Sequence, residues 1–308
     1  MGDELNRRFL IVAGKGGVGR TTLSAMIGLA AAKQGKRVLI AMCHVKEQLS
    51  RMLEAAPIGP DIVSVLPGID AVNMFPEAAL KEYGKLKLKV PLVYRAVFEN
   101  PSVMAFLRAT PGIDAWSMLG KVCYHVQEKS RDRRDRYDMV ILDAPATGHC
   151  LDMLRVPRVI MDLAPKGLLR RDAEKASLLL QDATQTAAIV VSWPEEMPIV
   201  EAIELTRGLE MELGVSVASV VVNGVMPELF SPDERAAMLQ NPPADTDGSE
   251  TCLRQVAYRR SLREREQVRL MGMLKHAIDK PHILIPLQPR AQLGRADLER
   301  LSARLLPT

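Results

Sequence analysis

Short apolar runs alternate with longer helix-compatible segments over most of the chain. The clearest runs occupy residues 9–13, 38–42, 137–143, 186–192, 217–222 and 282–286. Brief, bounded runs of this kind are typical of parallel strands that are buried on both faces by helices. The pattern therefore predicts an α/β fold with a doubly wound, mostly parallel sheet. Residues 72–74 (VNM) are expected to add a further short strand.

Helix-compatible segments lie between and after these strands, at residues 23–33, 199–213, 251–276 and 297–305. Gly214 stands where the second of them is expected to end. Residues 49–67 contain Pro57, Pro60 and Pro67, so we expect an irregular connection there. The polar residues 241–250 and the charged run 129–136 are expected to be exposed loops.

A long helical insertion is expected at residues 76–128, between two strands of the sheet. Its apolar residues recur at helical spacing, as Leu80 and Tyr83 do near its start and Trp116 and Leu119 near its end. Two interpretations are open. The insertion packs on the sheet as ordinary core, or its methionine, leucine and phenylalanine side chains form an adaptable hydrophobic groove. Residues 1–308 are expected to form a single domain that contains this subdomain.

Composition and charge exclude several classes of protein. The 308 residues are 47% hydrophobic, and a net charge of +4 is too small to indicate nucleic-acid binding. The four cysteines, Cys43, Cys123, Cys150 and Cys252, show no CxxC spacing, which fits a reducing compartment and provides no zinc site. No run approaches the ~18 apolar residues of a transmembrane helix, and no signal peptide precedes the first strand. We therefore expect a cytoplasmic protein without a transmembrane segment.

The chemistry of the chain centres on residues 14–22, GKGGVGRTT. An apolar run precedes this stretch and a helix-compatible run follows it, which is the context of a phosphate-binding loop. Glycines let backbone N–H groups curl around an anion, and the helix N-terminus adds its dipole. Thr21 is placed to ligate Mg²⁺, and Thr22 to support the turn. The predicted nucleotide-binding residues of the loop are Gly14, Lys15, Gly16, Gly17, Val18, Gly19, Arg20, Thr21 and Thr22.

A second acidic position completes a magnesium site in this prediction. The apolar run 137–143 ends in Asp143, an arrangement of the Walker B type, and its carboxylate is expected to hold Mg²⁺ together with Thr21. ATP and Mg²⁺ are the expected ligands. The run 38–42 ends at the same edge of a parallel sheet, where ligands bind in open α/β folds.

The position of Lys15, directly after Gly14, resembles the deviant Walker A loop, GKGGVGKTT in its usual form, which also occurs in the MinD and ParA ATPases. The resemblance implies a dimer, either of two identical chains or with a related ATPase, in which Lys15 reaches the nucleotide of the partner. Arg20 replaces the usual final lysine of the loop. Because arginine is planar and bulkier, this exchange puts hydrolysis in doubt more than binding.

The segment that follows Asp143, residues 144–149 (APATGH), is similar to the DTAPTGHT stretch of the ArsA/Get-type ATPases, which include arsenite pumps and tail-anchored-protein targeting factors. The resemblance extends over nearly the whole chain. It implies that residues 76–128 and 150–182 form a client-facing helical subdomain. It also assigns roles to seven further residues: His44 at the water-orienting position of switch I, Pro145, Thr147, Gly148 and His149 in switch II, and Asn223 beside the adenine, with Pro286 in the flanking loop.

Three functions are consistent with these residues. The first is a dimeric ATPase in which Lys15, Asp143 and His44 act in catalysis and the nucleotide cycle gates a surface for a hydrophobic protein client or a membrane-protein partner. The second is an ATP-binding scaffold with weak or no hydrolysis, because of Arg20 and His44. The third is a metalloid-efflux ATPase subunit, which needs clustered thiols such as Cys123 and Cys150. No nucleic-acid partner is expected.

Overall fold

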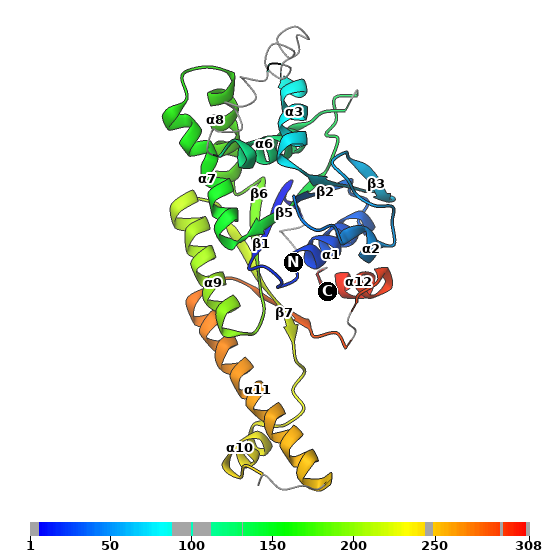
Figure 1. Cartoon of the computed structure of the whole chain (residues 1–308), viewed down its shortest axis with the longest axis vertical. Coiled ribbons are helices and arrows are strands. Elements are labelled where there is room, and N and C mark those ends of the chain that lie inside the picture. The colour runs from blue at the N-terminus through cyan, green and yellow to red at the C-terminus, as the bar shows by residue number, and fades with distance from the viewer. Residues whose placement is uncertain are drawn as a thin grey trace.

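The computed structural model describes residues 6–87, 100, 112–130, 132–243, 249–289 and 292–305. An eight-stranded sheet with the order β3-β4-β2-β5-β1-β6-β7-β8 lies at its centre (Figure 1). The strands are β1 (Phe9–Gly14), β2 (Val38–Cys43), β3 (Val63–Leu66), β4 (Ile69–Met74), β5 (Met139–Ala146), β6 (Thr186–Ser192), β7 (Val217–Val225) and β8 (His282–Pro286). All neighbouring strands pair in parallel except β3 and β4. The predicted mostly parallel α/β sheet is confirmed.

Strand β1 lies near the middle of the sheet, between β5 and β6, and all of its residues are buried. Its register places Val12 level with Asp143 of β5 and Gly14 level with Val191 of β6. The loop that follows Gly14 therefore leaves the sheet at its carboxyl edge, next to the end of β5. This is the edge at which ligands bind in open α/β sheets.

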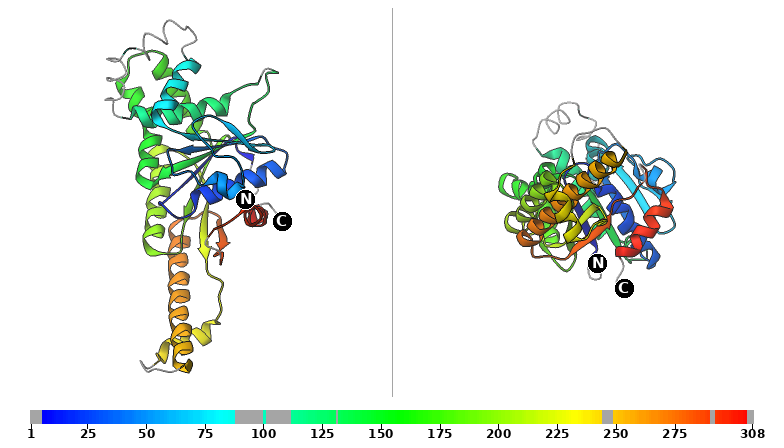
Figure 2. Two further views of the ribbon diagram at one scale, coloured as in Figure 1. Left: turned by 45° about the vertical axis from the view of Figure 1, so that its right-hand side comes forward. Right: turned by 90° about the horizontal axis from the view of Figure 1, so that it is seen from below.

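Helices cover both faces of the sheet (Figures 1 and 2). One face carries α1 (Arg20–Lys33), α2 (Leu49–Leu53), α12 (Arg295–Ser302) and the short η3 (Ala303–Leu305). The other carries α3 (Pro76–Lys87), α6 (Ile113–Gln127), α7 (Thr147–Leu163), α8 (Leu168–Gln181), α9 (Glu196–Arg207) and the π-helical η2 (Gly208–Leu213). Two separate hydrophobic clusters result, one on each face, as expected for a doubly wound sheet.

Helices α3, α6, α7 and α8 pack together at one end of the molecule (Figure 1). Trp116 and Leu119 of α6 are buried, and the Tyr83 hydroxyl donates a hydrogen bond to Asp172 of α8 at 2.6 Å. The apolar residues of α6 thus form core, as the first interpretation of the insertion holds. Large apolar side chains remain exposed on α7 and α8, namely Val159, Leu163, Leu168, Leu169 and Leu178. Residues 88–99 and 101–111 of the expected insertion lie outside the described residues.

Several expected boundaries were wrong. Residues 49–67 contain α2 and β3 in addition to irregular connections, because Met52 and Leu53 are buried against α1. The strand expected at 72–74 begins at Ile69. The helix expected at 199–213 begins at Glu196 and changes to π-helix at Gly208.

Helix α10 (Pro232–Gln240) was missed, although its start carries a recognisable signal. Ser231 and Glu234 form a capping box there, and Pro232 occupies the first turn. This combination is a sequence signature of a helix N-terminus.

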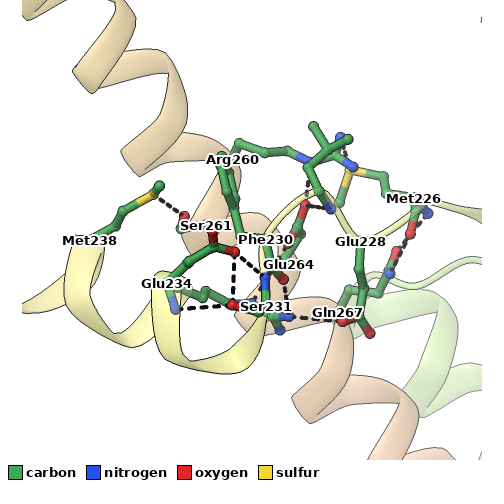
Figure 3. Close-up of polar contacts among 12 residues, drawn as sticks. Met226, Glu228, Phe230, Ser231, Glu234, Met238, Arg260, Ser261, Glu264 and Gln267 are labelled. Atoms are coloured by element: carbon green, nitrogen blue, oxygen red, sulfur yellow. Dashed lines mark hydrogen bonds and ion pairs between the residues drawn. The ribbon is translucent and has the colours of Figure 1, made fainter.

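Helix α11 (Ser249–Ala277) extends away from the sheet, with α10 packed beside its far end (Figures 1 and 2). Buried polar side chains of α11 hold the segment that leads from β7 to α10 (Figure 3). Glu264 accepts hydrogen bonds from Leu229 N at 3.0 Å and from Arg260 Nε at 2.8 Å. The amide of Gln267 pairs with both backbone groups of Met226, at 2.8 and 3.0 Å. We call α10, α11 and this segment the arm.

Among the described residues, no helix is both long enough and apolar enough to cross a membrane.

Candidate nucleotide-binding site

The glycine-rich loop joins the buried end of β1 to the start of α1. Gly17 and Gly19 adopt left-handed φ angles of 88° and 97°, which favour glycine. A Cβ on Gly14 would lie 2.3 Å from the Val191 carbonyl oxygen, so glycine is needed there for packing. A Cβ on Gly16 or Gly17 would meet nothing within 4 Å, so the outer side of the loop is open. Open space over glycines at a helix N-terminus fits a phosphate group.

Thr21 and Asp143 meet directly behind this loop. The Thr21 hydroxyl donates a hydrogen bond to Asp143 Oδ2 at 2.5 Å. Burial raises the pKa of Asp143 to about 6, although the Thr21 hydrogen bond and the charge of Arg20 act in the opposite direction. A buried carboxylate that is penalised for its charge is stabilised by a bound cation.

The oxygen atoms of Thr21 and Asp143 fit Mg²⁺. In the described part of the chain, no three histidine, cysteine or acidic side chains are grouped as a metal site. Mg²⁺ does not need such a group, because it commonly keeps several waters and binds through one or two protein oxygens together with substrate phosphates. Thr21 and Asp143 would hold the ion, which would neutralise charge on the phosphates.

Arg20 points toward the end of β5. Its guanidinium donates a hydrogen bond to the carbonyl oxygen of Ala144, the residue after Asp143. The positive charge of Arg20 therefore lies near the predicted magnesium ligands. The planar guanidinium is held by a backbone carbonyl, a geometry that the compact ammonium group of a lysine does not reproduce.

Lys15 forms an ion pair with Glu201 of α9, a residue that the sequence did not point to. The second oxygen of the same carboxylate, Glu201 Oε2, accepts a hydrogen bond from Thr147 Oγ1 at 3.0 Å. Lys15 of the loop and Thr147 of the expected switch II are thus joined through one acidic side chain. The available signal was weak: α9 follows the carboxyl end of β6, so its first turns lie at the same edge of the sheet as the loop.

A cavity lies beside the loop. Asn223 and Pro286 line a cavity of about 250 Å³ together with Thr22 and Trp193. The Asn223 amide nitrogen donates to the Val18 carbonyl oxygen at 2.9 Å, so this side chain contacts the loop itself. Sequence reasoning missed Trp193, whose ring packs against the backbone of Gly224 so closely that a Cβ there would lie 2.1 Å from it. Gly224 has a φ of 73°.

The other expected switch residues lie around the carboxyl edge of the sheet, and none of them forms a hydrogen bond or ion pair with the glycine-rich loop among the described residues. His44 follows β2 with a φ of 46°, and its exposed ring packs on Phe75, with 4.9 Å between the ring centroids. Pro145 lies within β5. Gly148 and His149 are exposed in the first turn of α7, which begins at Thr147. This segment is helical, and Gly148 has no positive φ.

Among the described residues, no cysteine belongs to a group of three or more side chains that could hold a metal ion. Cys123 and Cys150 are buried and free, on α6 and α7. Burial raises the pKa of the Cys150 thiol to about 12. Burial also raises the pKa of Cys43, to which the nearby charges of Asp143 and Cys150 contribute. Thiols in such surroundings stay protonated, whereas the thiolate is the form that binds soft metals.

Comparison with known proteins gives the family. The family described as anion-transporting ATPase matches residues 7–169 and 167–241. The chain belongs to this ATPase family. The match includes the glycine-rich loop, Asp143 and Glu201, and family membership identifies the chain as an ATP hydrolase.

Individual relatives are distant. ATPase BagA of Mycobacterium tuberculosis is 27% identical over 235 residues, which cover 74% of this chain and 68% of the relative. A putative arsenical pump-driving ATPase of Halobacterium salinarum is 25% identical over 316 residues, covering 96% of this chain and 44% of the relative. ATPase GET3 of Kluyveromyces lactis is 28% identical over 167 residues, covering 52% and 48%.

Proposed function

We propose that this ATPase binds MgATP on residues 14–22 and works as a dimer, in which Lys15 of each chain reaches the nucleotide of the other. The observation that carries this proposal is the Thr21–Asp143 contact of 2.5 Å behind an open glycine-rich loop. A hydroxyl and a carboxylate side by side behind such a loop are protein oxygens of the kind that a phosphate-bound Mg²⁺ needs, which supports the proposal. Asn223, Trp193 and Pro286 would enclose the base in the adjoining cavity.

The nucleotide cycle would act on a surface of α7 and α8. Thr147 starts α7 only a few residues after Asp143, so the helix is joined covalently to the magnesium site. The exposed Leu163, Leu168 and Leu178 provide an apolar surface farther along α7 and α8. Exposed apolar side chains of this kind suit a hydrophobic protein client or a membrane-protein partner. We expect the protein to work in the cytoplasm, as its cysteine usage predicts.

A second candidate is an ATP-binding scaffold with little turnover. Two contacts favour it. The hydrogen bond from Arg20 to the Ala144 carbonyl restricts the movement of the guanidinium, and the ring of His44 packs on Phe75. The buried thiols give no such support to metalloid efflux.

Steady-state and single-turnover ATP hydrolysis separate the two candidates. Purified protein is compared with Lys15→Ala and Asp143→Asn variants, and the molar mass is followed by sedimentation in the same samples. Turnover that requires Asp143 and Lys15 and coincides with dimers supports the dimeric motor. Tight MgATP binding without turnover supports the scaffold, and turnover by monomers that is insensitive to Lys15 refutes the role given to this lysine.

A further inference from the structure

Glu201 is the meeting point of three elements that are distant in the sequence. One carboxylate oxygen pairs with Lys15 of the glycine-rich loop, and the other accepts the 3.0 Å hydrogen bond from Thr147, the first residue of α7. Glu201 itself lies in α9. The ion pair is about one-third exposed on the lysine side and one-quarter exposed on the glutamate side. It is therefore shielded only partly from water.

We propose that Glu201 is a positioning residue that holds Lys15 back in the nucleotide-free chain and transmits its release to α7. We call its contacts with Lys15 and Thr147 the Glu201 latch. The proposal rests on the proposed function, because it takes the nucleotide of a partner chain as the second destination of Lys15. A Lys15 ammonium that reaches across to a phosphate on another chain leaves its place beside Glu201, so dimer formation opens the latch.

The contacts of α7 explain why opening the latch affects its first turn. Farther along, α7 is fixed to the π-helical turn η2. Arg158 Nη2 donates to the Leu213 carbonyl at 3.0 Å, and a Cβ on Gly208 would lie 2.9 Å from Leu151. The beginning of α7 is held differently, by the side-chain contact of Thr147 with Glu201. When Lys15 leaves, the Glu201 carboxylate loses its cationic partner. The hydrogen bond between Glu201 and Thr147 is then the contact that changes.

The same segment receives the other loop side chains. Thr21 contacts Asp143, Arg20 contacts Ala144, and Lys15 reaches Thr147 through Glu201. Three of the loop residues thus contact residues 143–147 directly or through one carboxylate. Opening the latch therefore changes the last of three supports of the segment that leads from the magnesium site to α7.

The first test probes the latch in the nucleotide-free protein. Acylation of Lys15 by an amine-reactive ester is followed by mass spectrometry in the wild type, in Glu201→Gln and in Glu204→Gln. Glu204 is an exposed glutamate of the same helix and serves as the matched control. Loss of a partly exposed ion pair predicts about two- to fivefold faster acylation of Lys15 in Glu201→Gln, with no change in Glu204→Gln. Equal rates in all three proteins overturn the latch.

The second test measures dimer formation with Mg²⁺ and the slowly hydrolysed analogue ATPγS. A symmetric dimer opens two latches, so the single-site factor is squared and Glu201→Gln should tighten dimerisation by about four- to 25-fold. In a Lys15→Ala background the same substitution should change dimerisation by less than about twofold, because no latch remains to be opened. A general effect on folding would act equally in both backgrounds, and an equal effect would overturn the proposal.

The outcomes separate the latch from the proposed function. If ATPγS produces dimers but Glu201→Gln changes neither dimerisation nor acylation, the dimeric function stands and the latch is refuted. If acylation accelerates but no protein dimerises with ATPγS, the proposed dimer and its coupling to Lys15 are refuted, although the Lys15–Glu201 contact is then established. Circular dichroism and the unfolding midpoint show whether each variant is folded.

Discussion

Gly224 lines the cavity beside the glycine-rich loop, and its replacement by alanine tests how that cavity is built. The residue is buried, and its φ of 73° lies in the left-handed region. A Cβ at this position would lie 2.1 to 2.4 Å from three ring atoms of Trp193, distances that real atoms do not adopt. The alanine variant must therefore displace the tryptophan ring, move the strand end, or both.

The cost of Gly224→Ala has two parts that a second variant separates. Left-handed backbone costs a non-glycine residue about 1 kcal/mol, and forcing an extra methyl group into a packed site costs about 1–3 kcal/mol. Gly35 has a similar φ of 82° but nothing within 4 Å of its Cβ position. Gly35→Ala should therefore lose only the first part, whereas Gly224→Ala should lose about 2–4 kcal/mol of unfolding free energy.

Urea unfolding of both variants measures the difference, and MgATP titration measures its effect on the pocket. Trp193 and Asn223 line the same cavity, so Gly224→Ala should also weaken nucleotide binding, while Gly35→Ala should not. Adding Trp193→Leu to Gly224→Ala should recover stability relative to the single variant, because the smaller side chain leaves room for the methyl group. Equal losses for Gly35→Ala and Gly224→Ala, or no recovery in the double variant, would refute this reasoning.

Three further predictions concern the site itself. In metal-free protein, Asp143→Asn should raise the unfolding free energy above pH 6 by up to about 3 kcal/mol and leave it unchanged below pH 4. The reason is that the raised pKa of about 6 penalises the charged carboxylate only in the native state. Urea titrations across this pH range measure the effect, and a less stable variant at pH 8 would contradict the prediction. Arg20→Ala should weaken MgATP binding by about ten- to hundredfold and Arg20→Lys much less, because a charge-assisted hydrogen bond to phosphate is lost only in the alanine variant. Calorimetric titration measures both affinities, and equal losses in the two variants would count against a phosphate contact. MgATP should change the tryptophan fluorescence of the wild type but not of Trp193→Phe, in which Trp116 remains in the helical end of the molecule; a signal that persists in the variant would place the base elsewhere.

The strand pattern predicted the central strands well because they are short, apolar and buried on both faces, as β1, β2 and β6 are. Such runs are recognisable from local sequence alone, as β1 and β7 show. The loop and Asp143 were predictable for the same reason, since each follows directly on one of these strands. The boundaries that failed depend on tertiary packing: α2 is only five residues long and is supported by α1 and α12 more than by its own propensity.

The residues missed at the site are those brought in by topology. Glu201 lies 186 positions from Lys15, and nothing in its own helix distinguishes it from Glu204 until the sheet order places α9 beside the loop. Trp193 was passed over because its role depends on the close approach of Gly224, a contact between two strand ends. Local patterns cannot encode such pairings, which arise only when the sheet is assembled.

The two hydrogen bonds between Gln267 and Met226 join the arm to the chain just after β7, close to the residue that contacts the glycine-rich loop. Met226 is three positions after Asn223, which bonds to the glycine-rich loop. Helix α11 begins at Ser249, 18 positions before Gln267, so this part of the helix is about 27 Å long. A tilt of about 5° at these two hydrogen bonds, too small to disturb the core, would move the far end by about 2 Å. A small tilt at the end of β7 would thus be felt mainly at the tip of the arm.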